Sequence, residues 1–410
     1  MPKPIIAGID IGTSYVQVVV ASETPDGGLE VLGSGKARAE GVRRGVVIDV
    51  ADASGSIRRA LIEARKATGI AVEHAYVAFG GTGLATLTGK GVVAVARADG
   101  EIGESDIERA LAAARSSLPQ QPNREIIHEI PVGFSVDKET HIKNPAGMFG
   151  NRLEAQVVFL TAFTPHLKNI IKSVELAGVN LDDVVAAPLA ASRAILSKHQ
   201  KEVGVMTLDL GGGSAALSVF EEGGLVSVNV LPVGLGHATH DIAIAFQTPL
   251  DAAERMKLEH GTLAASALGR REHIRLADYV AGETMVITKK DLAEIIEARC
   301  KDIFELADKH LKKIGRSGLL PAGVVLAGGG ANLEGIVEFA KRELLLPVTV
   351  GVPQGIRAAE EYSSDPSWAV ALGLCLWGRD EESAGMRMRG RTLGYQVWEK
   401  ILGWLKPFIP

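Results

Sequence analysis

Two residue types that often reveal a function are scarce in this sequence. Cysteine occurs only at Cys300 and Cys375 among 410 residues, and aromatic residues make up 5%. The two cysteines lack metal-ligand spacing, which argues against a zinc site and against a secreted, disulfide-stabilised fold. We therefore expect a reducing, cytoplasmic compartment. A strong charge of one sign is also missing: the net charge is −5. This argues against a general nucleic-acid-binding protein.

Long hydrophobic runs are missing as well. No window holds about 20 uninterrupted apolar residues, so the sequence predicts no membrane-spanning helix. The first 22 residues contain Asp10 and alternate as strands do, unlike a signal peptide. Apolar residues nevertheless make up 46% of the chain. The length predicts about two to four domains or subdomains, each with a core of its own.

Three common functional motifs are absent. The sequence has no GxGxxG dinucleotide fingerprint, no GxxxxGK[ST] phosphate loop and no GxSxG nucleophile. Its ten histidines are scattered. We interpret His128, His237 and His240 as structural or surface residues, because no acid or cysteine accompanies them at ligand spacing.

Two similar stretches place an aspartate and glycines at the end of an apolar run. IAGIDIGTSYVQVVV (6–20) and VMTLDLGGGSAALSV (205–219) each predict a strand, a polar turn and a return strand. This repeat predicts two related halves that face each other. Glycine lets backbone N–H groups approach an anion, and a carboxylate at the strand end suits hydrated Mg²⁺. Two opposed turns would hold the phosphates of one nucleotide, although either turn alone is equally compatible with an ordinary hairpin.

A third glycine motif, LAGGGANLEG (326–335), lies between a predicted strand and a predicted helix. Its three glycines let the backbone pass flat against a base or ribose. Elsewhere the apolar periodicity predicts a helix over 51–68 that ends at Gly69, a helix near 104–117 within an α+β unit, and a helix-rich segment over 237–315.

The order of these motifs resembles the actin/Hsp70/hexokinase superfamily: Asp10-Ile-Gly-Thr, then Asp209-Leu-Gly-Gly-Gly, then Ala327-Gly-Gly-Gly-Ala331. Two longer stretches are similar to FtsA, the bacterial cell-division actin homologue. They are REIIHEIPVGFSVDKETHIKNPAGMFGNRLEAQVVFLTA (124–162), similar to an inserted subdomain of that family, and HDIAIAFQTPLDAAERMKLEHG (240–261). The resemblance covers nearly the whole chain. It implies an α/β, actin-like fold of two related ribonuclease-H-like halves, with an FtsA-type inserted α+β subdomain and a C-terminal amphipathic helix.

The resemblance also implies the order of the subdomains along the chain. The first half comprises 1–83 and 163–202, interrupted by the inserted subdomain over 84–162. The second half comprises 203–236, 237–315 and 316–378, of which the last also contains a closing helix that returns to the first half. A flexible linker over 379–392 and the amphipathic helix over 393–410 complete the chain.

Site residues follow from the resemblance position by position. Asp10 and Asp209 would hold Mg²⁺ through water. Two phosphate loops would bind the phosphates of ATP: the first comprises Gly12, Thr13, Ser14 and Tyr15, and the second comprises Gly211, Gly212, Gly213 and Ser214. The side chains of Glu254 and Lys257 would contact the ribose and the base. The adenosine would be bordered by Gly328, Gly329, Gly330 and Asn332. Glu254 and Lys257 share one helix face at this spacing, so an exposed ion pair is the alternative for them.

Three positions depart from the family pattern. Where relatives have Glu-Pro-Leu-Ala, with an acid that orients the attacking water, this chain has Ala187-Pro188-Leu189-Ala190. Alanine cannot accept or relay a proton. Ala216 lies where the second loop of relatives has an aspartate, and Tyr15 lies where a lysine is common. We therefore assign no catalytic residue and expect nucleotide binding with weak or absent hydrolysis.

The last residues form a separate pattern. Apolar side chains recur at helical spacing, and tryptophans suit the headgroup boundary of a membrane. These residues are Val397, Trp398, Ile401, Leu402, Trp404, Leu405 and Phe408. From Met386 onward five basic residues oppose one acid, a net of +4, which favours anionic lipid. The stretch is too short to span a bilayer, so we expect it to lie in the interface; a terminal helix that packs on the body or a partner is the alternative.

These observations lead to one functional hypothesis. The resemblance implies an ATP-binding cell-division protein that polymerises with itself and anchors filaments of the tubulin-like protein FtsZ to the inner face of the cytoplasmic membrane. Downstream membrane proteins of the division machinery would be further partners, and nucleic acid would not. The alternatives are a pilus-assembly scaffold that resembles PilM, for which the apolar tail is unexpected, and a small-molecule kinase of the same superfamily, against which Ala187 argues.

Overall fold

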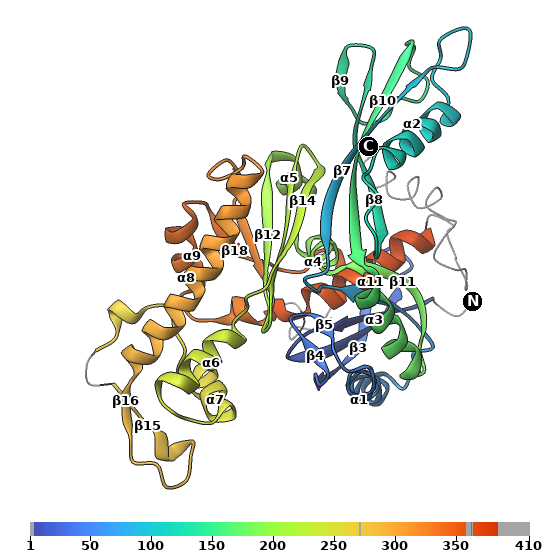
Figure 1. Ribbon diagram of the computed structural model, residues 1–410. Coiled ribbons are helices and arrows are strands. Elements are labelled where there is room, and N and C mark those ends of the chain that lie inside the picture. The colour runs from blue at the N-terminus through green and yellow to red at the C-terminus, as the bar shows by residue number, and fades with distance from the viewer. Residues whose placement is uncertain (1–3, 270–271, 358–361, 363, 384–410) are drawn as a thin grey trace.

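The computed structural model describes residues 4–269, 272–357, 362 and 364–383 (Figure 1). Within these residues the chain forms two α/β halves, each built on its own sheet, and a third, smaller sheet. The smaller sheet carries β7 to β10 and projects away from the first half (Figure 1).

Six strands form the sheet of the first half, in the order β11-β6-β1-β2-β3-β19. They are β1 (Ile5–Ile11), β2 (Tyr15–Glu23), β3 (Leu29–Arg38), β6 (His74–Phe79), β11 (Asn180–Ala186) and β19 (Ile356–Arg357). Two helix pairs cover it: α1 (Val50–Thr68) with α3 (Thr164–Leu176), and α4 (Ala187–Ile195) with α11 (Ala369–Ser383). Because helices cover the sheet, β1 and β2 are buried along most of their length, which explains their nearly continuous apolar sequence.

Local signals fix the ends of α1 as the sequence predicts. The carboxylate of Asp49 accepts hydrogen bonds from the backbone N–H groups of Ala51 and Asp52 at the helix start. Gly69 ends the helix in a left-handed conformation with φ 71°. The predicted stop at Gly69 is therefore confirmed.

The inserted subdomain has a four-stranded antiparallel sheet in the order β7-β10-β8-β9. Its elements are β7 (Ala85–Ala94), α2 (Glu104–Ser116), β8 (Arg124–Val136), β9 (Glu139–Ile142) and β10 (Arg152–Phe163). A separate core, which includes Phe134 and Phe159, lies between the sheet and α2. The helix can lie close on β7 because Gly89 has no side chain; a Cβ there would come within 2.5 Å of the Ala114 carbonyl oxygen.

The second half repeats the arrangement of the first. Its sheet has the order β14-β13-β12-β17-β18, with β12 (Val205–Leu210), β13 (Ala215–Glu221), β14 (Gly224–Leu231), β17 (Val324–Ala327) and β18 (Val348–Val350). Its helices are α6 (Gly236–Ala245), α7 (Leu250–His260), α8 (Lys289–Lys313) and α9 (Ile336–Leu344), and a hairpin of β15 (His273–Arg275) and β16 (Val286–Thr288) lies between α7 and α8. The segment over 237–315 is helix-rich, as predicted.

The predicted repeat is present in the topology of both sheets. In each half, the strand that carries the aspartate pairs antiparallel with the next strand and parallel with a later one: β1 with β2 and β6, β12 with β13 and β17. This confirms two related halves.

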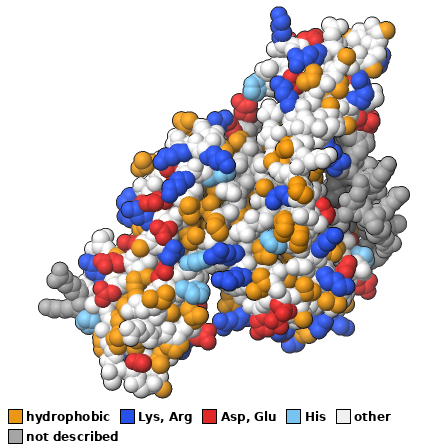
Figure 2. Space-filling view, in the orientation of Figure 1, with side chains coloured by type: hydrophobic (Ala, Val, Ile, Leu, Met, Phe, Trp, Pro, Cys, Tyr) orange, Lys and Arg blue, Asp and Glu red, His pale blue; other side chains and the backbone are white. Residues whose placement is uncertain are grey.

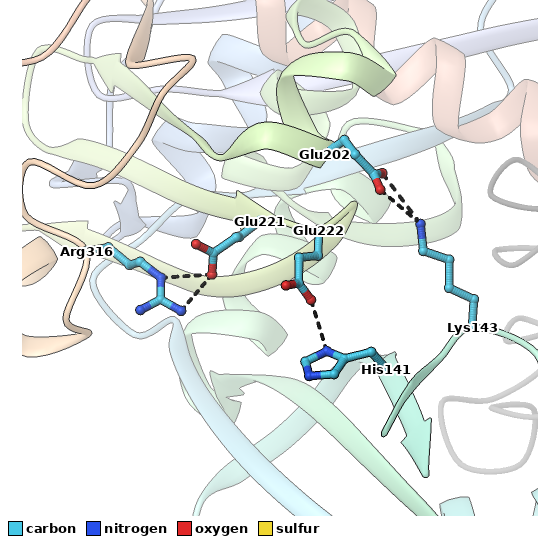
Figure 3. Close-up of polar contacts among 6 residues, drawn as sticks. All are labelled: His141, Lys143, Glu202, Glu221, Glu222 and Arg316. Atoms are coloured by element: carbon cyan, nitrogen blue, oxygen red, sulfur yellow. Dashed lines mark hydrogen bonds and ion pairs between the residues drawn. The ribbon is translucent and has the colours of Figure 1, made fainter. Parts of the chain in front are cut away.

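An outer contact joins the inserted subdomain to α5 and to the second half (Figure 3). We use this name for four residues: His141 and Lys143, which lie at and just after β9; Glu202 in α5 (Lys198–Val203); and Glu222 in the turn between β13 and β14. His141 Nδ1 lies 3.1 Å from Glu222 Oε2, and Lys143 Nζ donates to Glu202 Oε1 at 3.4 Å. Beside them Arg316 donates to Glu221 Oε2 at 2.6 and 2.9 Å (Figure 3).

The C-terminal boundary of the folded part differs from the sequence prediction. α11 continues to Ser383, past the predicted linker start at 379. Asp380 explains the extension, because Arg193 of α4 donates to its Oδ2 with two nitrogens, at 2.5 and 2.8 Å. The rest of the predicted linker and the whole predicted amphipathic helix over 393–410 lie outside the described residues.

Candidate functional site

Asp10 and Asp209 occupy equivalent places in the two halves. Each lies near the carboxyl end of a central strand, next to the turn into its antiparallel neighbour. In the strand registers Asp10 pairs with Gln17, and Asp209 pairs with Ala216. Each strand also has a parallel neighbour, so both carboxylates lie at the sheet edge where α/β proteins commonly bind ligands.

The two carboxylates face each other closely enough to interact. Burial raises the pKa of Asp10 to about 7, with a second contribution from the negative charge of Asp209. Burial also raises the pKa of Asp209 to about 6. Both residues keep part of their surface exposed. Two carboxylates that resist ionisation next to each other provide a favourable place for a cation.

The two predicted phosphate loops touch each other. A Cβ on Gly212 would overlap Ser14 Oγ, and a Cβ on Gly213 would lie 2.6 Å from Thr13 Oγ1. Larger residues at 212 and 213 would therefore push the halves apart. We call residues 10–14 and 209–213 together the inner junction.

The third glycine motif reaches the same place. Gly328 has φ 79°, and a Cβ on it would overlap Oδ1 of Asp209. Gly330 leaves room for the side chains of Leu235 and Leu210. By contrast, a Cβ on Gly329 would meet nothing within 4 Å. Asn332 Nδ2 donates to Asp365 Oδ1 at 2.8 Å.

Glu254 and Lys257 lie on one face of α7, as their spacing predicts. Lys257 Nζ is 2.7 Å from Glu254 Oε2 and donates to Thr239 Oγ1 at 2.8 Å and to the Leu235 carbonyl oxygen at 3.3 Å. The Lys257 side chain is 10% exposed, and Thr239 also bonds Glu254. Lys257 is therefore buried whereas the Glu254 side chain is 39% exposed, so the pair differs from the fully exposed ion pair that was the alternative.

Tyr15 lies at the edge of the inner junction and is half exposed. Lys36 of β3 places its Nζ 4.6 Å from the centroid of the Tyr15 ring and 5.7 Å from that of Trp368. A neighbouring strand thus brings a positive charge over the residue that occupies the usual lysine position.

Ala187 is the first residue of α4 and is buried. A Cβ on Gly80 would lie 3.1 Å from the Ala187 Cβ, so the methyl group fits against the end of β6. His128 also contributes here, because its Nε2 accepts a hydrogen bond from the Ala186 backbone N–H at 3.0 Å. This agrees with the structural role predicted for that histidine.

Several residues of the site were not predicted from the sequence. Gln17 is buried opposite Asp10, and its Nε2 donates to Ser367 Oγ at 3.4 Å. Ser367 in turn bonds Asp365, which links the first half to Asn332. Gly234 was also missed; a Cβ there would overlap the carbonyl oxygen of Gly211. A glycine-rich stretch directly after a strand, GLG at 234–236, was the available signal.

The donor set fits a hydrated divalent cation bound with a nucleotide. Among the described residues no three His, Cys, Asp or Glu side chains form a metal-binding cluster. Two facing carboxylates with raised pKa values are nevertheless present. Mg²⁺ usually takes one or two carboxylates and keeps water and phosphate oxygens as its other ligands. Asp10 and Asp209 match that requirement.

Comparison with known proteins agrees with this arrangement. Residues 206–373 match the family model described as "Cell division protein FtsA", and residues 81–161 match the model "SHS2 domain inserted in FTSA". The chain is 34% identical to the cell division protein FtsA of Pseudomonas aeruginosa over 98% of its own length and 97% of that protein. The chain belongs to the FtsA family. It is 32% identical to the Bacillus subtilis FtsA, covering 97% of this chain and 88% of that protein.

Solved structures of other proteins share the fold. A PilM-PilN type IV pilus biogenesis complex superimposes with a TM-score of 0.66 at 19% identity, covering 92% of this chain and 99% of that chain. MreB5 of Spiroplasma citri bound to ADP gives a TM-score of 0.54 at 13% identity, with 94% and 99% covered. The expected fold class is therefore confirmed for the two halves and the inserted subdomain: the chain is an actin-like cell-division protein of the FtsA family.

Family membership supports the expectations about the cofactor and the partners in general terms. The fold is that of a superfamily whose members bind a nucleotide with a divalent metal, and the FtsA family acts with other cell-division proteins and with copies of itself. No described helix has the length and hydropathy needed to cross a membrane.

Proposed function

We propose that this protein binds ATP with Mg²⁺ between its two halves, polymerises, and anchors FtsZ filaments to the inner face of the cytoplasmic membrane. The observation that carries the proposal is the inner junction. Two aspartates from equivalent strands interact across it, and three glycine motifs far apart in the sequence converge on it.

Each predicted residue has a role in this proposal. Mg²⁺, once bound, would neutralise phosphate charge and occupy the place where Asp10 and Asp209 repel each other. The two phosphate loops would contact the phosphates with backbone N–H groups, and the Thr13 and Ser14 hydroxyls lie beside them. Glu254, Lys257 and the third glycine motif would border the adenosine.

Hydrolysis is proposed to be weak or absent. A general base or water-orienting acid contributes about 10²–10⁴-fold in rate, and Ala187 cannot supply that function. ATP would then act mainly by favouring one relative position of the halves, which shifts the population toward the form that polymerises. A phosphate-release assay checks this: turnover that is fast and unaffected by the Ala187→Glu change would contradict it.

Membrane attachment is assigned to the C-terminal segment over 393–410. Its apolar side chains and basic residues suit the interface of an anionic bilayer. One such segment binds modestly, whereas a filament presents many of them and gains avidity. The face that binds FtsZ is proposed to lie on the segment over 237–315, and downstream division proteins would bind elsewhere on the assembled filament.

Electron microscopy on an anionic lipid monolayer tests polymerisation and attachment together. With Mg²⁺ and ATP, the full chain should form ordered filaments on the monolayer and recruit FtsZ. A variant that lacks 393–410 should lose attachment but keep nucleotide binding, measured by calorimetry. Absence of adenine nucleotide binding by the full chain would overturn the proposal.

The PilM-PilN complex resembles this chain in fold at 19% identity, whereas family membership argues against a PilM-like scaffold role. A scaffold of that kind does not require lipid binding by its C-terminal residues. Liposome flotation that is identical with and without 393–410, together with no co-sedimentation with FtsZ, would favour it.

A further inference from the structure

A two-residue turn packs against both phosphate loops. It joins β4 (Val42–Arg43) to β5 (Val46–Val47) and has Arg44 and Gly45 as its central residues. The backbone N–H of Gly45 donates to Thr13 Oγ1 at 2.9 Å. On the other side, a Cβ on Gly213 would lie 3.0 Å from the backbone nitrogen of Arg44. The turn therefore bridges the two halves at the inner junction.

The third side of the turn is closed as well. A Cβ on Gly45 would lie 2.7 Å from the Gly80 carbonyl oxygen and 3.1 Å from Gly81 Cα. The turn cannot shift without disturbing the first phosphate loop, the second phosphate loop or the residues after β6. Its position is fixed by main-chain packing rather than by the side chain of Arg44.

Arg44 has a backbone conformation that arginine rarely adopts. Arg44 has φ 52° and Gly45 has φ 70°. Turns with positive φ at both central residues strongly favour Asn-Gly or Gly-Gly, because a bulky side chain is strained there. A strained residue that the surrounding structure holds in place often has a functional role.

The charge of Arg44 acts near the start of α6, where the backbone N–H of Gly236 bonds the Gly212 carbonyl oxygen of the second phosphate loop. Arg44 is exposed, and among the described residues no ion pair involves it. Its charge acts on His237, at the start of α6, as does that of Arg299. Arg299 already binds Asp241 and Asp302, so its charge is largely compensated. Figure 2 shows Lys, Arg and His side chains gathered between α6 and the β4–β5 turn.

We infer that Arg44 binds the terminal phosphate of the nucleotide. This rests on the proposed function. Three side chains would then contact different parts of the bound nucleotide at the inner junction. The carboxylates of Asp10 and Asp209 would bind the metal ion, and the guanidinium of Arg44 would bind the terminal phosphate, which carries the most negative charge. Arginine is suited to this because its planar fork can donate two parallel hydrogen bonds to one phosphate.

Titration of the full chain with Mg²⁺ and ATP, ADP or AMP tests the assignment. Arg44→Asn removes the charge and suits the turn, so it should melt at the same or a higher temperature. It should weaken ATP binding by about tenfold or more, the effect of losing a charge-assisted contact, and leave AMP binding within about twofold. Arg44→Gly also suits the turn and should behave alike. Arg43→Asn, at the exposed neighbouring residue, is the matched control and should bind ATP as the wild type does.

The outcomes separate this inference from the proposed function. Wild-type protein that binds ATP, with unchanged affinity in both Arg44 variants, overturns the assignment. Equal losses for ATP and AMP, together with a lower melting temperature, would show a structural role and overturn it too. If the wild type binds no adenine nucleotide, the proposed function fails and the assignment fails with it.

Discussion

Two of the contacts that link the subdomains of the molecule are built differently. At the inner junction Gly212 and Gly213 pack closely against the hydroxyls of Ser14 and Thr13, beside the two largely buried carboxylates of Asp10 and Asp209. The outer contact consists of polar and charged side chains that are mostly exposed; His141 and Glu222 are 76% and 69% exposed.

The difference predicts how each contact tolerates change. Main-chain packing leaves no room for an added atom, and a buried charge cannot be screened by solvent. Exposed ion pairs contribute about 0–1 kcal/mol and weaken in salt. The inner junction should therefore be sensitive to single atoms, whereas the outer contact should be sensitive only to charge and salt.

The largest effect is expected from Gly328→Ala. The new Cβ would overlap Asp209 Oδ1 and lie 2.8 Å from the Leu210 carbonyl oxygen, in a backbone conformation with φ 79°. Strain and overpacking together should lower the free energy of unfolding by about 4 kcal/mol. Urea denaturation measures this. Gly329→Ala is the matched control, because a Cβ there meets nothing within 4 Å; equal losses in both variants would contradict the packing argument.

Most mutations lower the free energy of unfolding, but Asp10→Asn should raise that of the nucleotide-free protein at pH 8. The folded-state pKa of Asp10 is raised from 3.8 to about 7. The stabilisation that the protonated carboxyl gains from folding is therefore complete below about pH 4 and is lost as the pH rises through 7. The amide keeps a neutral group there, so the nucleotide-free variant should be more stable than the wild type at pH 8 by on the order of 3 kcal/mol.

Unfolding curves between pH 5 and pH 8 check this prediction. The advantage of Asp10→Asn should shrink steadily toward pH 5, where the wild-type carboxyl is already protonated. Asp251→Asn, at an exposed aspartate paired with Arg38, is the control. A difference that does not vary with pH would mean that Asp10 is not the group responsible. The variant should also bind MgATP more weakly than the wild type does.

Lys257→Ala should have an intermediate effect. It removes a buried ammonium group and with it the ion pair to Glu254 and the hydrogen bonds to the Leu235 carbonyl oxygen and the Thr239 hydroxyl. We expect a loss of about 2 kcal/mol in the free energy of unfolding. Lys290→Ala, an ordinary lysine of α8 that pairs with Glu294 at 3.7 Å, should change little by comparison. If the two variants are equally stable by thermal melting, the buried network does not contribute.

The smallest effect is expected at the outer contact. Lys143→Glu places two acids together and should cost about 0.5 kcal/mol in low salt. Adding Glu202→Lys should restore the pairing, so the double variant should match the wild type in low salt. A double-mutant cycle by urea denaturation at two salt concentrations measures the coupling. Coupling that persists unchanged in high salt would show that solvent does not screen this contact.

The sequence alone determined the elements and their order. Periodic apolar residues and a capping signal located α1 and its end at Gly69, and the two Asp-Gly stretches predicted the related halves. The aspartates and glycines of the candidate site could be proposed from the sequence because a local turn indicates both properties: glycine permits close approach, and a carboxylate suits a cation.

Tertiary structure decided which residues meet. Gln17, Ser367 and Asp365 are unremarkable along the chain, and only the packing of β2 against the segment before α11 connects them. The same holds for Arg44, whose proposed role in phosphate binding depends on a turn that packs between loops of both halves. Local sequence can specify a turn or a helix end because neighbouring residues form it, but contacts between distant segments depend on the whole fold.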